Sequence, residues 1–220
     1  MSYGVLCIND SGYVQIDAET PRLCVLTKGS YAGNGTANVT FPRAVTSVDP
    51  PLVFVRPDGG AIQVPFSVLF TGGPGNWTGF SMKASNVNGS LSGLYFAAAW
   101  ASMSTASFGM RIWNSAGTLV YDSGAPAVVV TFAAGNWTYA GFEDLAIGRR
   151  WLWTIAKSLG PGEYVSLNPF TMYCYNQAAG GSCSLGVDYA NNRIIMYSVA
   201  TTAWTADPGN RPFLCARLVS

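Results

Sequence analysis

Short apolar segments separated by turn residues follow one another along the whole chain. Some are continuous and others alternate apolar with polar positions, and Gly, Pro, Asn or Asp stands between them. Segments of this length and spacing are typical of β-strands joined by tight turns. The clearest of them cover residues 23–26, 52–55, 94–100, 127–132 and 213–219. The pattern predicts an all-β protein of β-sandwich architecture.

One segment, residues 142–159, is long enough to form a helix. Gly148 stands in its middle, and glycine weakens the interior of a helix. Residues 150–155 (Arg-Trp-Leu-Trp-Thr-Ile) also suit a strand. A strand is the favoured interpretation, and a helix stays open as the alternative.

A longer pattern occurs twice, 105 positions apart. Residues 3–18 and 108–123 share one frame: an aromatic residue and Gly, four residues, Asn-x-x-Gly, four residues, and Asp. Asn at the start of a turn accepts backbone hydrogen bonds, and Gly three residues later adopts positive φ, so each copy is predicted to be a β-hairpin. The final Asp occupies the same position of the frame in both copies, so a structural role is favoured for these two residues over a catalytic one. The framework residues are Gly4, Asn9, Gly12, Asp17, Gly109, Asn114, Gly117 and Asp122.

The repeat also predicts how the chain is organised. We expect two β-sandwich halves, residues 1–105 and residues 106–220, each opened by a related hairpin. Outside the hairpins the halves do not align, because the Gly-Asn-Trp sequence at 75–77 returns at 135–137, only 60 positions later.

Charge is scarce, and this narrows the possible partners. Apolar residues make up 49% of the chain and charged residues 10%, with a net charge of +1. Nucleic acid or an anionic membrane would require a basic cluster, and the densest is the pair Arg149 and Arg150, interpreted as a solvated pair on a strand edge. The small-apolar stretch at 94–101 is far shorter than the roughly 20 residues of a membrane span. We expect no nucleic-acid partner and no membrane insertion.

Cysteine and histidine usage bears on cofactors. The chain has no histidine and five cysteines without a C-x-x-C spacing. We therefore expect no metal ion, haem or other cofactor. Cys174 and Cys183 flank a Gly-rich loop that a disulfide would close. Buried free thiols are the preferred interpretation, and the disulfide is the alternative.

Catalytic arrangements are also scarce. Without histidine, neither a Ser-His-Asp nor a Cys-His arrangement is available. A glycosidase needs two positioned carboxylates, and no spacing singles out a pair. We expect no enzymatic activity, with a polysaccharide depolymerase as the alternative. The carboxylates of the second half are Asp122, Glu143, Asp144, Glu163 and Asp188.

Aromatic residues make binding the more promising activity. Aromatic rings stack on sugars and dominate protein interfaces. Trp77 and Trp137 each follow Gly-Asn in an expected loop, so we predict that they contact a partner or receptor, with core packing as the alternative. Asn176 and Gln177, in the polar loop at 176–184, are predicted to add polar contacts.

The two hairpin frames and the sequence Leu-Val-Phe-Val-Arg-Pro at 52–57 together carry a family resemblance. They resemble small tail-tip proteins encoded in the tail modules of bacteriophages and prophages of Gram-negative bacteria. The resemblance implies a non-enzymatic structural component of the virion's distal tail, associated with fibre or baseplate and contributing to tail assembly and host attachment. It assigns no catalytic residue.

The resemblance also implies partners and a location. The partners are other phage tail proteins, and we expect a homo-oligomer, a trimer by the usual symmetry of tail fibres. Residues 1–4 resemble no secretion signal, so synthesis is expected in the bacterial host cytoplasm. The alternative function is a receptor-binding module that recognises a host surface polysaccharide or pilus.

Overall fold

The computed structural model describes residues 6–8, 10, 14–17, 21–60, 62–84, 89–102, 107–146, 148–167, 173–176, 179–200 and 211–219. Every regular element among these residues is a β-strand, which confirms the predicted all-β class. The same residues contain no helix of the length and apolarity needed to cross a membrane.

The strands are 3 to 12 residues long and paired antiparallel throughout. They are β1 (Leu6–Ile8), β2 (Val14–Asp17), β3 (Leu23–Asn34), β4 (Thr36–Val45), β5 (Leu52–Pro57), β6 (Pro65–Gly73), β7 (Asn76–Ala84), β8 (Ser90–Trp100), β9 (Arg111–Trp113), β10 (Leu119–Asp122), β11 (Ala127–Ala134), β12 (Thr138–Leu145), β13 (Gly148–Ile155), β14 (Glu163–Ser166), β15 (Tyr173–Asn176), β16 (Ala179–Asp188), β17 (Arg193–Ala200) and β18 (Phe213–Val219). The ambiguous segment at 142–159 thus contributes to β12 and β13, as the favoured interpretation predicted.

Six strands form a closed barrel in the order β11-β18-β14-β5-β8-β3. The barrel takes β3, β5 and β8 from the first half of the chain and β11, β14 and β18 from the second. The sheets therefore do not separate into the expected halves, residues 1–105 and 106–220. Local sequence patterns specify where strands occur, whereas closing the barrel removes open strand edges by pairing strands that are distant in sequence.

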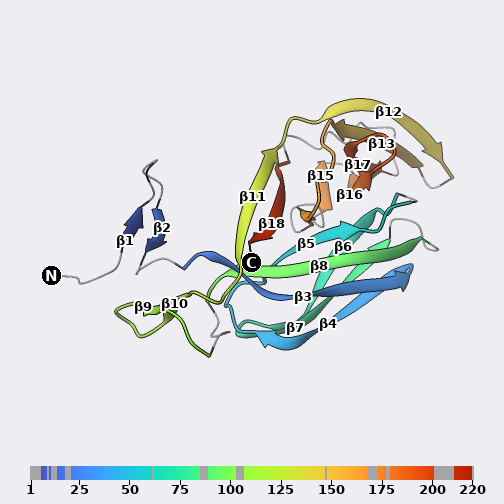
Figure 1. The fold of residues 1–220 in the computed structure, drawn as a ribbon. Coiled ribbons are helices and arrows are strands. Elements are labelled where there is room, and N and C mark those ends of the chain that lie inside the picture. The colour runs from blue at the N-terminus through green and yellow to red at the C-terminus, as the bar shows by residue number, and fades with distance from the viewer. Residues whose placement is uncertain are drawn as a thin grey trace.

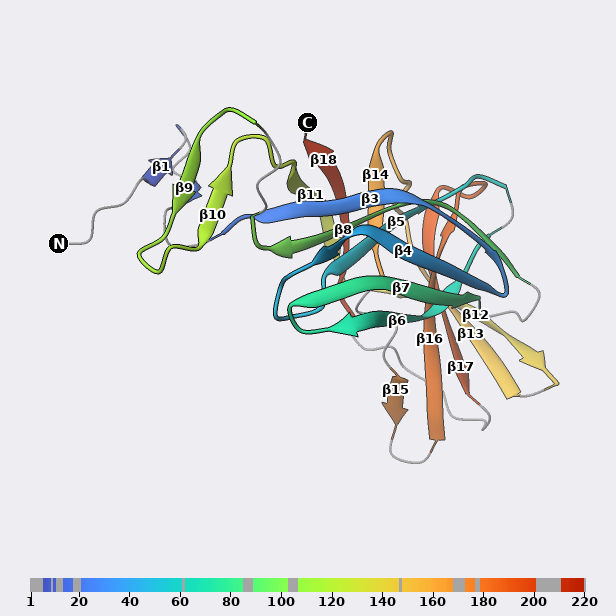
Figure 2. The same cartoon turned by 90° about the horizontal axis from the view of Figure 1, so that it is seen from below.

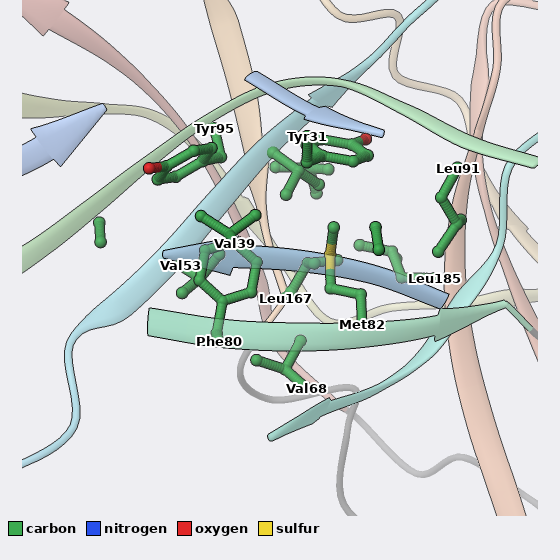
Figure 3. Close-up of a cluster of buried hydrophobic side chains, with 14 of the residues drawn as sticks. Tyr31, Val39, Val53, Val68, Phe80, Met82, Leu91, Tyr95, Leu167 and Leu185 are labelled. Atoms are coloured by element: carbon green, nitrogen blue, oxygen red, sulfur yellow. The ribbon is translucent and has the colours of Figure 1, made fainter. Parts of the chain in front are cut away.

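Two open sheets pack beside the barrel. One has the order β4-β7-β6 and the other the order β12-β13-β17-β16-β15. The largest core cluster joins barrel residues such as Val53 to residues of both sheets, such as Phe80 and Leu185. Figure 3 shows these three side chains converging with others from β3, β4 and β8.

The apolar run at 52–57 has a structural explanation. Val53 and Val55 lie in the largest core cluster, whereas Phe54 lies in a second cluster, where its ring stacks on Phe96 at 4.7 Å. Because both faces of β5 are buried, no polar residue alternates along it. Arg56 ends the run and donates from Nη1 to the backbone oxygens of Gly160 (2.7 Å) and Glu163 (2.9 Å).

The two small hairpins, β1-β2 and β9-β10, lie at one end of the molecule. Figures 1 and 2 show them beyond the end of the barrel where β3 begins, while β12 and β13 lie toward the opposite end. The fold thus presents two separate surfaces that are not part of the barrel wall.

Candidate docking surface

The hairpin β9-β10 confirms the predicted turn chemistry. The side-chain oxygen of Asn114 accepts hydrogen bonds from the backbone nitrogens of Ala116 (3.1 Å) and Thr118 (2.9 Å). The backbone nitrogen of Gly117 donates to the carbonyl oxygen of Asn114 (2.9 Å), and Gly117 has a φ of +76°. The turn is therefore closed by the two residues that the frame places there.

The Asp at the end of this frame is structural, as expected. Asp122 is 1% exposed and accepts hydrogen bonds from Arg111 Nε (2.8 Å) and the backbone nitrogen of Gly124 (2.8 Å). The frame's first glycine, Gly109, has a φ of +135°, and a Cβ there would lie 2.3 Å from Ser123 Oγ. The positive φ favours glycine, because other residues rarely adopt it, and an added Cβ would also require the Ser123 side chain to rotate.

The two hairpins have the same strand register. Leu6, Cys7 and Ile8 pair with Asp17, Ile16 and Val14, and Arg111, Ile112 and Trp113 pair with Asp122, Tyr121 and Leu119. Every pair in the second hairpin lies 105 positions after its counterpart in the first. Of the other first-copy framework residues, Gly4, Asn9 and Gly12 lie outside the described part of the chain, as does the side chain of Asp17. Leu6 stands where the second copy has Arg111, so the first copy has no arginine at the position that pairs with Asp122 in the second.

The hairpins pack against each other through one apolar face. Ile112 and Val120 of the second hairpin are buried, and Ile16 of the first packs against them together with Tyr121. Arg22, just after the first hairpin, places its guanidinium 4.4 Å from the centre of the Tyr121 ring. A lone two-stranded hairpin is marginally stable in water, so each hairpin gains stability from this shared face.

Large apolar side chains on and beside the hairpins face solvent. We define the hairpin surface as the following six residues with their exposed fractions: Leu6 (60%), Ile8 (54%), Trp100 (62%), Phe108 (90%), Met110 (46%) and Trp113 (55%). Trp100 ends β8 and pairs with Leu23, so it stands beside the base of the hairpins. These residues give the hairpin end of the molecule several large exposed apolar groups on more than one face, and such groups mark regions where proteins bind partners.

The two tryptophans predicted as contacts differ in exposure. Trp77 is 8% exposed, and its indole nitrogen donates to the carbonyl oxygen of Ser47 (3.0 Å). Trp137 is half-buried, donates to the carbonyl oxygen of Arg211 (2.9 Å), and lies 5.4 Å from the Phe213 ring. Trp77 is thus part of the core, as the alternative predicted, whereas Trp137 packs against the core and keeps an exposed part, so its contact with a partner stays a prediction. A Gly-Asn-Trp sequence indicates a loop but does not show which carbonyl lies near the indole.

Two predicted contact residues are polar, and two exposed tryptophans were not predicted as contacts. Asn176 ends β15, but its side chain and the whole of Gln177 lie outside the described residues. Trp113 was missed, although the alternation in β9 signals it: Ile112 is buried, so the next residue faces solvent. The signal for Trp100 is weaker, since it follows a run of buried residues.

The second-half carboxylates serve as hydrogen-bond acceptors. Glu163 accepts from Lys157 Nζ (2.6 Å), Thr131 Oγ1 (2.6 Å) and the backbone nitrogen of Gly160 (2.7 Å). Burial acts to raise the pKa of Glu163, but these hydrogen bonds outweigh it and hold the pKa at about 2. Burial likewise opposes the hydrogen bonds from Asn191 and Arg193 that lower the pKa of Asp188. A depressed pKa makes a carboxyl unsuitable as a general acid at neutral pH.

Cysteine pairing differs from the preferred interpretation. Cys183 is disulfide-bonded, whereas Cys7, Cys24 and Cys215 are free thiols. The fifth cysteine of the sequence is Cys174, whose side chain lies outside the described residues. The expectation of a free thiol at Cys183 was therefore wrong. In the sequence, Cys174 and Cys183 lie nine positions apart across a Gly-rich loop, and this spacing is compatible with either a disulfide or two free thiols.

The hairpin surface is the part of the molecule where the repeated frame and the exposed apolar residues coincide. The side chains that define it are apolar, with the Arg111–Asp122 ion pair beside them, so its main chemistry is contact with another apolar surface. In comparisons with known proteins, no family model, no curated protein and no solved structure matches the chain.

Proposed function

We propose that this protein is a non-enzymatic structural component of a bacteriophage tail tip, associated with fibre or baseplate and contributing to tail assembly and host attachment. It binds neighbouring tail proteins through the hairpin surface. The family resemblance of the hairpin frames and of residues 52–57 supports the proposed location in the virion's distal tail. The hairpin surface, five of whose six residues lie in those frames, is the single observation that carries the proposal.

The composition of the hairpin surface suits a protein interface. Protein interfaces are enriched in Trp, Phe and Met and depleted of Lys and Glu at their centres. The hairpin surface contains Trp100, Trp113, Phe108 and Met110. Each large apolar side chain gains about 1.5–3 kcal/mol when it moves from water to a buried contact. A partner that covers this surface is therefore bound mainly by the hydrophobic effect.

Assembly of tail particles tests the proposal. We predict that the double replacement of Trp113→Ser and Phe108→Ser lowers the amount of the chain in purified tails at least about tenfold, corresponding to about 1.4 kcal/mol of lost binding. The measurement is quantitative mass spectrometry of tails produced from a genome that encodes the variant. Circular dichroism of the isolated variant checks that its fold is retained.

A matched control separates docking from general surface effects. Leu69 on β6 is 59% exposed, close to the 55% of Trp113, but it lies outside the hairpin surface. Leu69→Ser should leave tail incorporation unchanged. The proposal fails if the wild-type chain is absent from purified tails, or if Leu69→Ser reduces incorporation as much as the hairpin variant does.

A further inference from the structure

A second surface lies on β12, at the edge of the five-stranded sheet. The pairing of β12 with β13 is interrupted between Tyr139 and Gly141 by a β-bulge. Gly141 has a φ of +119°, and a Cβ built there would meet no atom within 4 Å. Bulges redirect side chains and are frequent beside functional sites. Here the bulge leaves open space directly over the backbone.

A cavity of about 180 Å³ occupies that space. Sites for drug-sized ligands measure about 300–1,000 Å³, so this cavity has room for a single small ring. It is lined by the bulge at Ala140 and Gly141, by the ion pair of Glu143 and Arg150, by Leu152, and by the aromatic residues Phe142 and Tyr197.

The polar groups of the cavity have capacity for a ligand. Arg150 Nη2 donates to Glu143 Oε2, and the Arg150 guanidinium lies 4.4 Å from the centre of the Tyr197 ring. Within the described residues, the other Glu143 oxygen and the remaining Arg150 N–H groups make no hydrogen bond. One carboxylate oxygen thus remains to accept from a hydroxyl, and several guanidinium N–H groups remain to donate to one.

The local charge is balanced. Glu143 faces Arg150 across the two strands, and the next pair along, Asp144 and Arg149, is also an ion pair. Two carboxylates and two guanidiniums cancel, so the cavity offers no net attraction to an anion or a cation. The bulge and the charged residues of β12 also disfavour addition of a partner strand at this edge.

We infer that this cavity binds a neutral sugar ring. Its hydroxyls exchange hydrogen bonds with Glu143, Arg150 and the Tyr197 hydroxyl, and its apolar face lies against Leu152 and the bulge. This arrangement of an apolar wall with a few convergent polar groups is typical of small-ligand sites. The inference does not rest on the hairpin surface, which is formed by other strands at the other end of the molecule.

Saturation-transfer NMR with glucose, galactose and N-acetylglucosamine as separate probes tests the inference. We expect saturable binding of at least one of them, with a dissociation constant of about 1–10 mM for so few contacts. Glu143→Ala and Arg150→Ala should each weaken binding about tenfold or more. Tyr197→Phe, which removes only a hydroxyl, should weaken it less.

The adjacent ion pair supplies the control. Successive residues of a strand face opposite sides of the sheet, so Asp144 points away from the face that carries Glu143. Asp144→Ala therefore removes an equivalent ion pair and should leave sugar binding unchanged. The inference is overturned if none of the three sugars binds saturably, if Asp144→Ala abolishes binding as Glu143→Ala does, or if glucuronic acid binds more tightly than glucose.

Discussion

Glu163 shows how a single residue fixes several segments at once. Its carboxylate accepts from Lys157, Thr131 and Gly160, while its carbonyl oxygen accepts from Arg56. The residue thereby links β5, β11, β14 and the turn before β14. Hydrogen bonds to charged groups contribute about 1.5–3 kcal/mol each, which makes Glu163 a structural acceptor whose removal leaves several donors without a partner.

The low pKa of Glu163 predicts how stability depends on pH. Its pKa is about 2 in the folded chain against an ordinary value of 4.5. The stabilisation is therefore fully present above pH 4.5 and is lost as the pH falls toward 2. We predict that Glu163→Gln lowers the free energy of unfolding by about 2–3 kcal/mol at pH 7 and by much less near pH 2.

Urea unfolding at both pH values measures this difference. Asp144→Asn is the matched comparison, because the side chain of Asp144 is 67% exposed in its ion pair and exposed pairs contribute about 0–1 kcal/mol. A destabilisation by Glu163→Gln that is equal at the two pH values would contradict the assignment.

At the scale of elements, features formed by contacts between nearby residues could be predicted from the sequence. Features that depend on contacts between distant residues could not. The hairpin β9-β10 was predictable because Asn114 and Gly117 close the turn by contacts within a few residues. The surroundings of Trp77 and Trp137 could not be predicted, because each indole donates to a carbonyl at least 30 positions away in the sequence. Barrel closure likewise depends on Ala127 pairing with Cys24, for which no local pattern exists.

The contact between hairpins predicts a local effect of mutation. Ile112 is 9% exposed and is one of the two buried residues of the second hairpin, with Val120, that form the cluster against which Ile16 packs. Removing a buried isoleucine side chain to Ala costs about 2–5 kcal/mol, more than a two-stranded hairpin can lose and remain closed. We predict that Ile112→Ala speeds amide hydrogen exchange in β1, β2, β9 and β10.

The barrel provides the internal reference for that experiment. Amides of β5 and β8 should keep their exchange rates, since neither strand belongs to the hairpin cluster. Ile62→Ala, at an apolar position that is 41% exposed and outside the hairpins, should change nothing. Equal acceleration in barrel and hairpins would mean that the hairpins are part of the barrel's cooperative unit.

At the scale of the whole molecule, the barrel separates two surfaces of different chemistry. The hairpin surface is apolar and suits contact with a neighbouring protein, whereas the cavity at the β12 bulge has polar groups and suits a sugar. They lie toward opposite ends of the fold (Figures 1 and 2). A subunit with this layout is able to hold a neighbour at one end while the other end meets a ligand.

Because the barrel combines strands from both halves of the chain, neither half should fold alone. In a fragment of residues 1–105, Phe54 and Phe96 lose the packing of Tyr164 and Ala216, and β3 and β5 lose their partners β11 and β14. Strands with open edges and exposed aromatic rings form no stable sheet. We predict that the fragment shows no cooperative thermal transition by circular dichroism and little chemical-shift dispersion by NMR.

Mixing this fragment with residues 106–220 supplies the positive control. The second fragment contributes β11, β14 and β18, so the mixture is expected to regain a cooperative transition, because closing the barrel then costs only association of the two pieces. A sharp transition in the first fragment by itself would restore the division into two independent halves. Recovery only on mixing would instead mean that the repeated hairpins begin two parts of one barrel and do not mark a boundary between independent domains.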